Sequence, residues 1–223
     1  MKGLVVFDLD GTLIDTATEI TEAVNRTLAD FTDRSVAESD VRRWIGHGTG
    51  WLMQQAWADQ IGEPDKADWP QVMSRFVAHY HDTAGTMSRP YPFVLETLAV
   101  LRSLGIGRAI LTNKESRFTE RVLQAHGMTD IFDMVISGDS LPTKKPDPAG
   151  LFHCLQQLNV AESACLFVGD SEIDVVTGRA AAVACWAVPY GYNYGRPIAE
   201  AGPDRLIDDI RPVVGFFRDG LSH

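Results

Sequence analysis

The chain has 223 residues, of which 45% are hydrophobic and 22% charged, a composition typical of a globular protein with one sizeable core and room for a smaller appended unit. Twenty Lys and Arg residues against 30 Asp and Glu residues give a net charge of −10, which argues against the basic surface that duplex binding requires. No apolar run is long enough to span a bilayer. We therefore expect a soluble, cytoplasmic protein that binds neither nucleic acid nor membrane; its oligomeric state leaves no trace in the sequence.

The first predicted element is a short apolar strand over residues 4–7, followed by Asp8, Asp10 and a turn at Gly11. Buried parallel strands carry binding sites at their carboxyl ends, which is where this pair lies. Two close carboxylates repel each other unless a cation or a shared proton relieves them. The pattern favours an aspartate nucleophile, an acid–base partner and a hard metal ion; the alternative is a purely structural carboxylate pair.

Residues 15–85 show helical periodicity without a valine-rich run, which predicts an all-helical insert. The expected helices run from a cap at Asp15 or Thr16 to Phe31, from a cap at Ser39 to Trp44, over residues 49–60 and around residues 76–80. The insert would hinge on the core at residues 15–16 and 85–90.

The turn Trp44-Ile45-Gly46-His47-Gly48 joins two of these helices. Its glycines would let backbone amides approach a substrate carboxylate closely. The candidate specificity residues are Arg43, Gly46, His47 and Gly48. The alternative is an ordinary helix–helix turn with solvated arginines.

From residue 86 onward, short apolar runs alternate with helical patterns, which predicts an α/β fold with a Rossmann-like parallel sheet and helices on both faces. The expected strands cover residues 108–111, 134–137, 164–168 and 183–188, and the expected helices cover 93–104, 116–125, 149–158 and 173–181. The predicted domains are a catalytic core of residues 1–14 and 86–223 and a helical cap of residues 15–85.

Polar residues follow these strands where each one ends. Thr112 and Asn113 follow the second strand of the core, Lys145 precedes a helix, and Asp170 follows a later strand. The carboxyl ends of parallel strands converge, so these side chains would meet Asp8. Carboxylates, donors for an oxyanion and an ammonium suit phosphoryl transfer, whereas no Gly-x-Gly-x-x-Gly opening indicates hydride transfer.

Four motifs in this order resemble those of the haloacid-dehalogenase superfamily, and the helical insert resembles its small cap. The motifs are Asp8-x-Asp10-Gly11-Thr12, Thr112-Asn113, Lys145-Pro146-x-Pro148 and Gly169-Asp170-Ser171-x-x-Asp174. The narrower segments at residues 44–48 and 190–195 resemble bacterial phosphoglycolate phosphatases.

The resemblance implies a phosphomonoesterase that forms an aspartyl-phosphate at Asp8, with Asp10 as general acid and then base. It implies a Mg²⁺ cofactor at the side chains of Asp8 and Asp170 and the backbone carbonyl of Asp10. Thr112 and Lys145 are the other implied catalytic residues, and they bind the phosphoryl oxygens together with Asn113. Asp174 would support Lys145 or a metal-bound water.

The implied partner is a small phosphate monoester, first of all 2-phosphoglycolate, which would yield glycolate and phosphate. A sugar-phosphate phosphatase on the same scaffold and a phosphoglucomutase-type isomerase are the alternatives. A dehalogenase is disfavoured because displacement of a halogen needs neither Asp10 nor a metal. A non-catalytic binding protein is disfavoured because every catalytic residue type is kept.

Two expectations concern the scaffold alone. Cys154, Cys165 and Cys185 lack any metal-ligand spacing, which favours buried reduced thiols. The segment Ala182–Trp186 departs from the smaller, glycine-containing turn expected after the helix of the fourth motif. Local packing there should differ from the usual arrangement.

Overall fold

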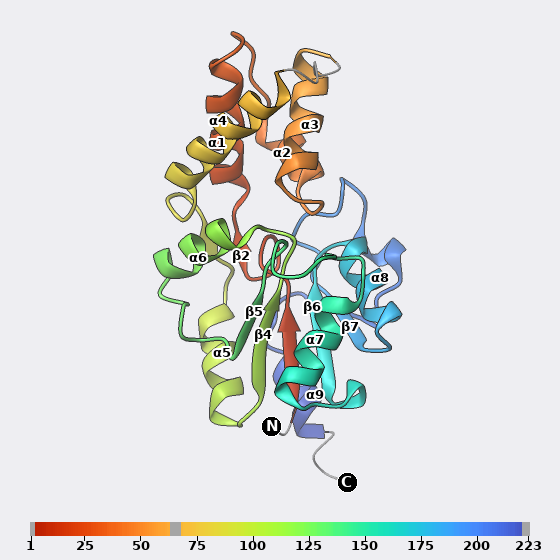
Figure 1. The fold of residues 1–223 in the computed structure, drawn as a ribbon. Coiled ribbons are helices and arrows are strands. Elements are labelled where there is room, and N and C mark those ends of the chain that lie inside the picture. The colour runs from red at the N-terminus through yellow and green to blue at the C-terminus, as the bar shows by residue number, and fades with distance from the viewer. Residues whose placement is uncertain (1–2, 63–67, 220–223) are drawn as a thin grey trace.

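The computed structural model describes residues 3–62 and 68–219 (Figure 1). Its centre is a six-stranded sheet in the order β5-β4-β1-β6-β7-β8, with every neighbouring pair parallel. The strands are β1 (Leu4–Phe7), β4 (Gly107–Leu111), β5 (Met134–Ile136), β6 (Cys165–Gly169), β7 (Ala184–Ala187) and β8 (Arg205–Leu206). The predicted α/β fold with a parallel sheet is confirmed.

Strand β1 lies between β4 and β6 and is fully buried. Its alternate residues enter two separate apolar clusters, Val5 and Phe7 on one face and Leu4 and Val6 on the other. A strand covered on both faces needs a continuous apolar run, which is what the sequence has there. The backbone N–H of Asp8 still donates to the Val168 carbonyl at 2.9 Å, so the first acidic residue is held by the sheet.

Helices cover both faces of the sheet (Figure 1). They are α5 (Val94–Ser103), α6 (Ser116–Ala125), α7 (Ala149–Leu158), α8 (Glu172–Ala180) and α9 (Val213–Asp219), with short 3₁₀ turns at Glu162–Ala164 and Ile198–Ala201. The bounds predicted for α6 and α7 are confirmed, and those for α5 and α8 differ by one residue at each end. Strand β8 and helix α9 were not predicted; β8 has only two residues and both are exposed, so it leaves no apolar run in the sequence.

The described residues of the insert form four helices beyond the carboxyl edge of the sheet: α1 (Ala17–Ala29), α2 (Glu38–Trp44), α3 (Thr49–Gln60) and α4 (Trp69–Thr83) (Figure 1). Helix α1 packs along α4. Two predicted details were wrong. Ser39 lies inside the first turn of α2, whose N-cap is Ala37, and α1 ends at Ala29 before reaching Phe31.

The two chain segments that connect the sheet to the insert pair with each other in a small antiparallel ribbon, which was not predicted. Strand β2 (Ile14–Asp15) pairs with β3 (Arg89–Pro90). Close by, the buried Glu19 carboxylate accepts hydrogen bonds from the N–H groups of Gly85 and Ser88 at 2.8 and 3.1 Å. The two connecting segments therefore lie side by side. The division into core and cap stays a prediction, and residues 1–2, 63–67 and 220–223 of those ranges lie outside the described residues.

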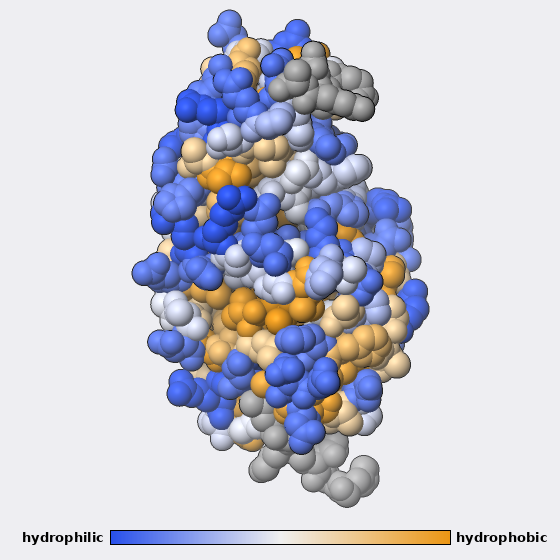
Figure 2. Space-filling model, viewed as in Figure 1, coloured by the Kyte–Doolittle hydropathy of each residue, from blue (hydrophilic) through white to orange (hydrophobic). Residues whose placement is uncertain are grey.

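Figure 2 shows hydrophilic residues over most of the helical insert and an apolar area over the sheet between α5 and α7. The three cysteines are buried and unpaired, as expected. Ala182 has a φ of 54°, a conformation that favours glycine. Among the helices of the described residues, we find none with the length and apolar character needed to cross a membrane.

Candidate active site

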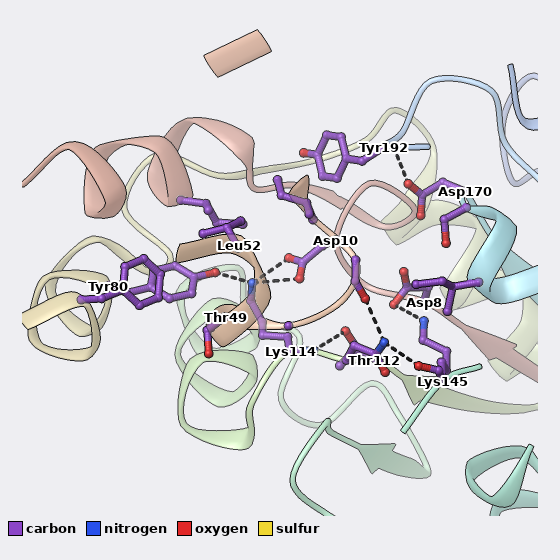
Figure 3. Close-up of a pocket in the computed structure, with 18 residues that line it drawn as sticks. Asp8, Asp10, Thr49, Leu52, Tyr80, Thr112, Lys114, Lys145, Asp170 and Tyr192 are labelled. Carbon is purple, nitrogen blue, oxygen red and sulfur yellow. Dashed lines mark hydrogen bonds and ion pairs between the residues drawn. The ribbon is translucent and has the colours of Figure 1, made fainter. Parts of the chain in front are cut away.

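A pocket lies between the carboxyl ends of the strands and the helical insert (Figure 3). The strand ends and the loops that follow them supply its polar side. These residues are Asp8, Asp10, Thr112, Asn113, Lys114, Lys145, Asp170 and Ser171. The insert supplies a mostly apolar side made of Ile20, Ile45, Leu52, Phe76 and Tyr80, with Gly46, Gly48 and Thr49.

The first polar group in the pocket is a buried ion-pair cluster. The Lys145 ammonium lies 2.8 Å from Asp8 Oδ1 and 2.7 Å from Asp174 Oδ1. Burial alone would lower the pKa of Lys145, but the carboxylates of Asp174 and Asp8 outweigh burial and raise it. Burial raises the pKa of Asp8, and Lys145 opposes that rise. The ammonium is thus held charged beside the predicted nucleophile.

Asp174 is fixed in this cluster by the start of α8. Its Oδ2 accepts hydrogen bonds from the Ser171 hydroxyl at 2.7 Å and from the backbone N–H of Ser171 at 3.0 Å, which completes a capping box. Both of its oxygens are therefore occupied by Ser171 and Lys145. This arrangement makes Asp174 a support for Lys145.

Asp170 faces Asp8 from the end of β6. Its Oδ1 accepts a hydrogen bond from the Thr12 hydroxyl at 2.8 Å, and its Oδ2 accepts one from the backbone N–H of Tyr192. Burial, followed by the charges of Asp8 and Asp174, raises the pKa of Asp170 well above its usual range. A Cβ at Gly191 would lie 2.3 Å from Asp170 Oδ2, so only glycine allows this approach.

Carboxylate oxygens of Asp8, Asp170 and Asp174 lie within 4.8 Å of one another. Three buried carboxylates beside one ammonium leave an excess of negative charge, which a divalent cation would relieve. Hard oxygen ligands of this kind fit Mg²⁺. Asp8 and Asp170 line the pocket and Asp174 does not, so Asp8 and Asp170 are the side chains placed to hold it. The predicted ligand at the Asp10 carbonyl stays a prediction.

A second lysine–aspartate pair lies beside the first (Figure 3). The Lys114 ammonium donates to both carboxylate oxygens of Asp10, at 2.8 and 2.9 Å, and also to the Tyr80 hydroxyl. Thr16 Oγ1 donates to Asp10 at 2.7 Å. Neither Lys114 nor Tyr80 was predicted as a site residue. The polar run that continues past Asn113 was the available signal for Lys114, whereas Tyr80 was treated only as a helix residue.

Thr112 and Asn113 follow β4 as predicted, but the Asn113 side chain faces the insert. Its amide donates to the Gly46 carbonyl at 2.8 Å and to the Lys145 carbonyl at 2.9 Å, which uses both donor hydrogens. Thr112 is buried, and its hydroxyl accepts from the Lys114 N–H at 3.2 Å. Asn113 therefore connects the strand ends to the turn between α2 and α3.

The structure separates the four candidate specificity residues of that turn. Gly46 and Gly48, with φ values of 125° and 92°, line the pocket. Arg43 is half-exposed, pairs with Asp40 and lies outside the pocket lining. His47 is also outside it, with its ring beside those of Trp51 and Tyr194. The turn thus presents the backbone of Gly46 and Gly48 to the pocket, whereas the side chains of Arg43 and His47 take no part in its lining.

Tyr192 joins the metal-ligand candidate Asp170 to the start of α1. Its hydroxyl accepts from the N–H groups of Thr16 and Ala17 at 3.0 and 3.1 Å and donates to Asp15. The 190–195 loop is therefore connected to the ribbon at which the insert leaves the core. The signal available in the sequence was three tyrosines flanked by glycines, which did not indicate this contact.

The family model described as Haloacid dehalogenase-like hydrolase matches residues 5–188 of the chain. A protein of Pseudomonas savastanoi pv. phaseolicola named phosphoglycolate phosphatase is 39% identical over 95% of this chain and 78% of its own length. One of the same name from Psychrobacter arcticus is 36% identical over 96% of this chain and 95% of its own length.

Among solved structures, a crystal structure from Haemophilus somnus, described as a predicted phosphoglycolate phosphatase, has a similar fold. It superposes with a TM-score of 0.91 and 32% identity, over 96% of this chain and 98% of its own. The similarity extends over both the sheet and the helical insert.

Proposed function

Because this chain belongs to the haloacid dehalogenase-like hydrolase family, we propose that it is a Mg²⁺-dependent phosphomonoesterase with 2-phosphoglycolate as its substrate. Membership in the family confirms the resemblance drawn from the four motifs. The proposal rests on the Asp8 carboxylate, which is buried and lies 2.8 Å from the Lys145 ammonium. A carboxylate oxygen of Asp170 lies within 4.8 Å of it. The names of the relatives support the substrate.

Asp8, Asp170 and the carbonyl of Asp10 would hold Mg²⁺. When bound, the ion would neutralise charge on the phosphoryl oxygens and orient the phosphorus toward Asp8. Lys145 adds a fixed positive charge beside the nucleophile. Asp174 keeps that lysine in place through a second ion pair.

The proposed reaction has two displacements at phosphorus. In the first, an Asp8 carboxylate oxygen forms a bond to phosphorus, the bond from phosphorus to the ester oxygen breaks, and Asp10 gives its proton to the leaving alkoxide. In the second, Asp10 takes a proton from water while the water oxygen attacks the aspartyl-phosphate. Inorganic phosphate leaves and the Asp8 carboxylate is restored.

The chemistry of the insert's wall favours a substrate without free hydroxyl groups. Its side chains in the pocket are apolar apart from Thr49 and the Tyr80 hydroxyl. The Thr49 hydroxyl is already bonded to Glu115, and the Tyr80 hydroxyl to Lys114. A sugar phosphate would bury several hydroxyls against such a wall without partners, which costs free energy. A two-carbon acid has none to bury.

The test is inorganic phosphate release from 2-phosphoglycolate and from a panel of sugar phosphates, with Mg²⁺ and with EDTA. We expect a strong preference for 2-phosphoglycolate that disappears in EDTA. Release spread evenly over sugar phosphates would overturn the substrate, and activity that persists in EDTA would overturn the cofactor. Conversion of a sugar phosphate to its isomer without phosphate release would favour the mutase alternative.

A further inference from the structure

Lys114 is a buried cation that the proposed reaction does not use. Its side chain is 3% exposed and lines the pocket. Among the described residues of the pocket lining, Lys114 and Lys145 carry the only positively charged side chains. Lys145 is paired with two carboxylates, Asp8 and Asp174, whereas Lys114 is paired with one, Asp10, and with the neutral Tyr80 hydroxyl. Of the two cations, Lys114 is therefore the one whose charge leaves room for a further anionic partner.

The position of Lys114 relates it to the leaving group. Its ammonium lies 2.8 and 2.9 Å from the two oxygens of Asp10, the residue proposed to protonate the ester oxygen. Figure 3 places it on the far side of Asp10 from Asp8 and Lys145, toward Leu52, Thr49 and Tyr80. A leaving group whose ester oxygen meets Asp10 would therefore extend into the part of the pocket that contains the Lys114 ammonium.

We propose that Lys114 is the specificity-determining residue that binds the carboxylate of the substrate's leaving group. The inference rests on the proposed function and deepens it. A carboxylate one carbon from the ester oxygen is the nearest anionic group that such a substrate can offer to an ammonium bonded to Asp10. A charged group in a largely apolar pocket needs such a partner.

The surroundings of Lys114 hold its ammonium toward the pocket. The Tyr80 hydroxyl accepts from it, and its Nζ lies 5.0 Å from the centre of the Tyr80 ring. The N-terminus of α3 begins at Thr49 in the same pocket and adds a favourable dipole for an anion. Side chains that could replace Lys114 are absent from the insert's share of the lining, as described in the structure.

The test compares kcat/KM for 2-phosphoglycolate with kcat/KM for ethyl phosphate, which has the same ester oxygen but no carboxylate. The variant Lys114→Met also removes a partner of Asp10, so it slows both substrates. The ratio of the two values cancels that shared loss. We expect the ratio to fall by about 10- to 100-fold, the usual effect of removing a charged hydrogen-bond partner. Lys114→Arg should restore part of it.

A matched control is Arg26→Met, which removes a positive charge from the exposed face of α1 and should leave the ratio unchanged. A second readout is competitive inhibition by two phosphonates that are not turned over: 3-phosphonopropionate, which carries a carboxylate, and propylphosphonate, which does not. Lys114→Met should weaken the first inhibitor selectively.

The outcomes separate this inference from the proposed function. If the wild-type protein shows no preference for 2-phosphoglycolate over ethyl phosphate, the proposed substrate is wrong. If the wild-type preference is present and Lys114→Met keeps it, the substrate stands and the role of Lys114 is overturned. If Lys114→Met lowers kcat/KM equally for both substrates and weakens the binding of both inhibitors equally, Lys114 acts only through Asp10 and its role in specificity is overturned.

Discussion

Two lysine–aspartate pairs lie side by side at the end of β1, and their surroundings differ. Lys145 and Asp8 belong with Asp174 to a cluster built from the end of β1, the loop before α7 and the start of α8, all of them outside the helical insert. Lys114 and Asp10 contact Tyr80 of α4 and Thr16, which precedes α1, so their partners include the helical insert. One pair is therefore fixed by the sheet, and the other depends on where the insert lies.

This difference separates two tasks. In the proposed reaction the nucleophile must stay in one place through both displacements, and a cluster anchored by β1, β6 and a capping box would provide that rigidity. In the proposed reaction, the acid–base partner and the leaving-group site act on the part of the substrate that departs. The further partners of this pair, Tyr80 and Thr16, lie on the insert's side of the pocket, so the pair's surroundings depend on the contact between the insert and the sheet.

The largest effect should come from Asp8→Asn. The change keeps the shape of the side chain and removes the nucleophilic carboxylate, so we expect kcat to fall by at least about 1,000-fold. The measurement is phosphate release together with the circular dichroism spectrum, which should match that of the wild-type protein. Substantial turnover by a folded variant would contradict the nucleophile assignment.

The loss of activity in Asp10→Asn should depend on the leaving group of the substrate. Loss of general acid catalysis should slow alkyl phosphates by about 100- to 10,000-fold. For p-nitrophenyl phosphate, whose leaving group needs no proton, the first displacement should be slowed much less. Burst kinetics would separate it from the second displacement. Equal slowing of the first displacement for both substrates would show that Asp10 is not the acid.

Asp174→Asn tests the rigidity of the first pair. It removes one carboxylate from a fully buried ion pair and weakens the cap of α8, so the free energy of unfolding should fall by about 3 kcal/mol. Urea denaturation measures the loss. The control is Glu172→Gln on the same helix, whose half-exposed ion pair with Arg196 should be worth less than about 1 kcal/mol. Equal effects of the two changes would argue against a buried anchor.

Asp15 tests the ribbon that connects the second pair to the sheet. Burial works to raise the pKa of Asp15, but hydrogen bonds from Tyr192 and Arg42 outweigh it and lower this pKa below 3.8. A carboxyl whose pKa is lower in the folded state than in the unfolded state stabilises the fold at pH values above its unfolded-state pKa. This stabilisation is lost as the pH falls through the folded-state pKa. The difference in unfolding free energy between wild type and Asp15→Asn should therefore shrink from pH 6 to pH 3. A difference that stays constant would remove Asp15 as an electrostatic contact.

The smallest effect lies outside both pairs. Ala182 has a φ of 54°, so Ala182→Gly should raise the free energy of unfolding by about 0.5–1 kcal/mol. Ala180→Gly, at an exposed helical position two residues earlier, should lower it by a similar amount. Thermal denaturation of the two variants compares them directly. The same sign for both would show that the positive φ carries no strain.

Much of the first pair could be predicted from the sequence, and much of the second could not. Local patterns reveal all four residues of the first cluster: Asp8 and Asp170 follow apolar runs, Asp174 lies in the first turn of α8, and Lys145 lies in the loop before α7. Lys114 also follows a strand, but its partners Asp10 and Tyr80 lie 104 and 34 residues away. Nothing in the periodicity of α4 distinguishes Tyr80 from an ordinary core residue.

The sequence by itself determined the parallel sheet, the helices around it and the strand ends at which polar residues gather. Apolar runs that stop at a charge or a glycine are a local property, and burial of such runs leaves few arrangements. Only the tertiary structure decided that β2 pairs with β3, that Asn113 faces Gly46 and that Arg43 and His47 lie outside the pocket. Those contacts depend on side-chain direction across two packed units, which no local pattern encodes.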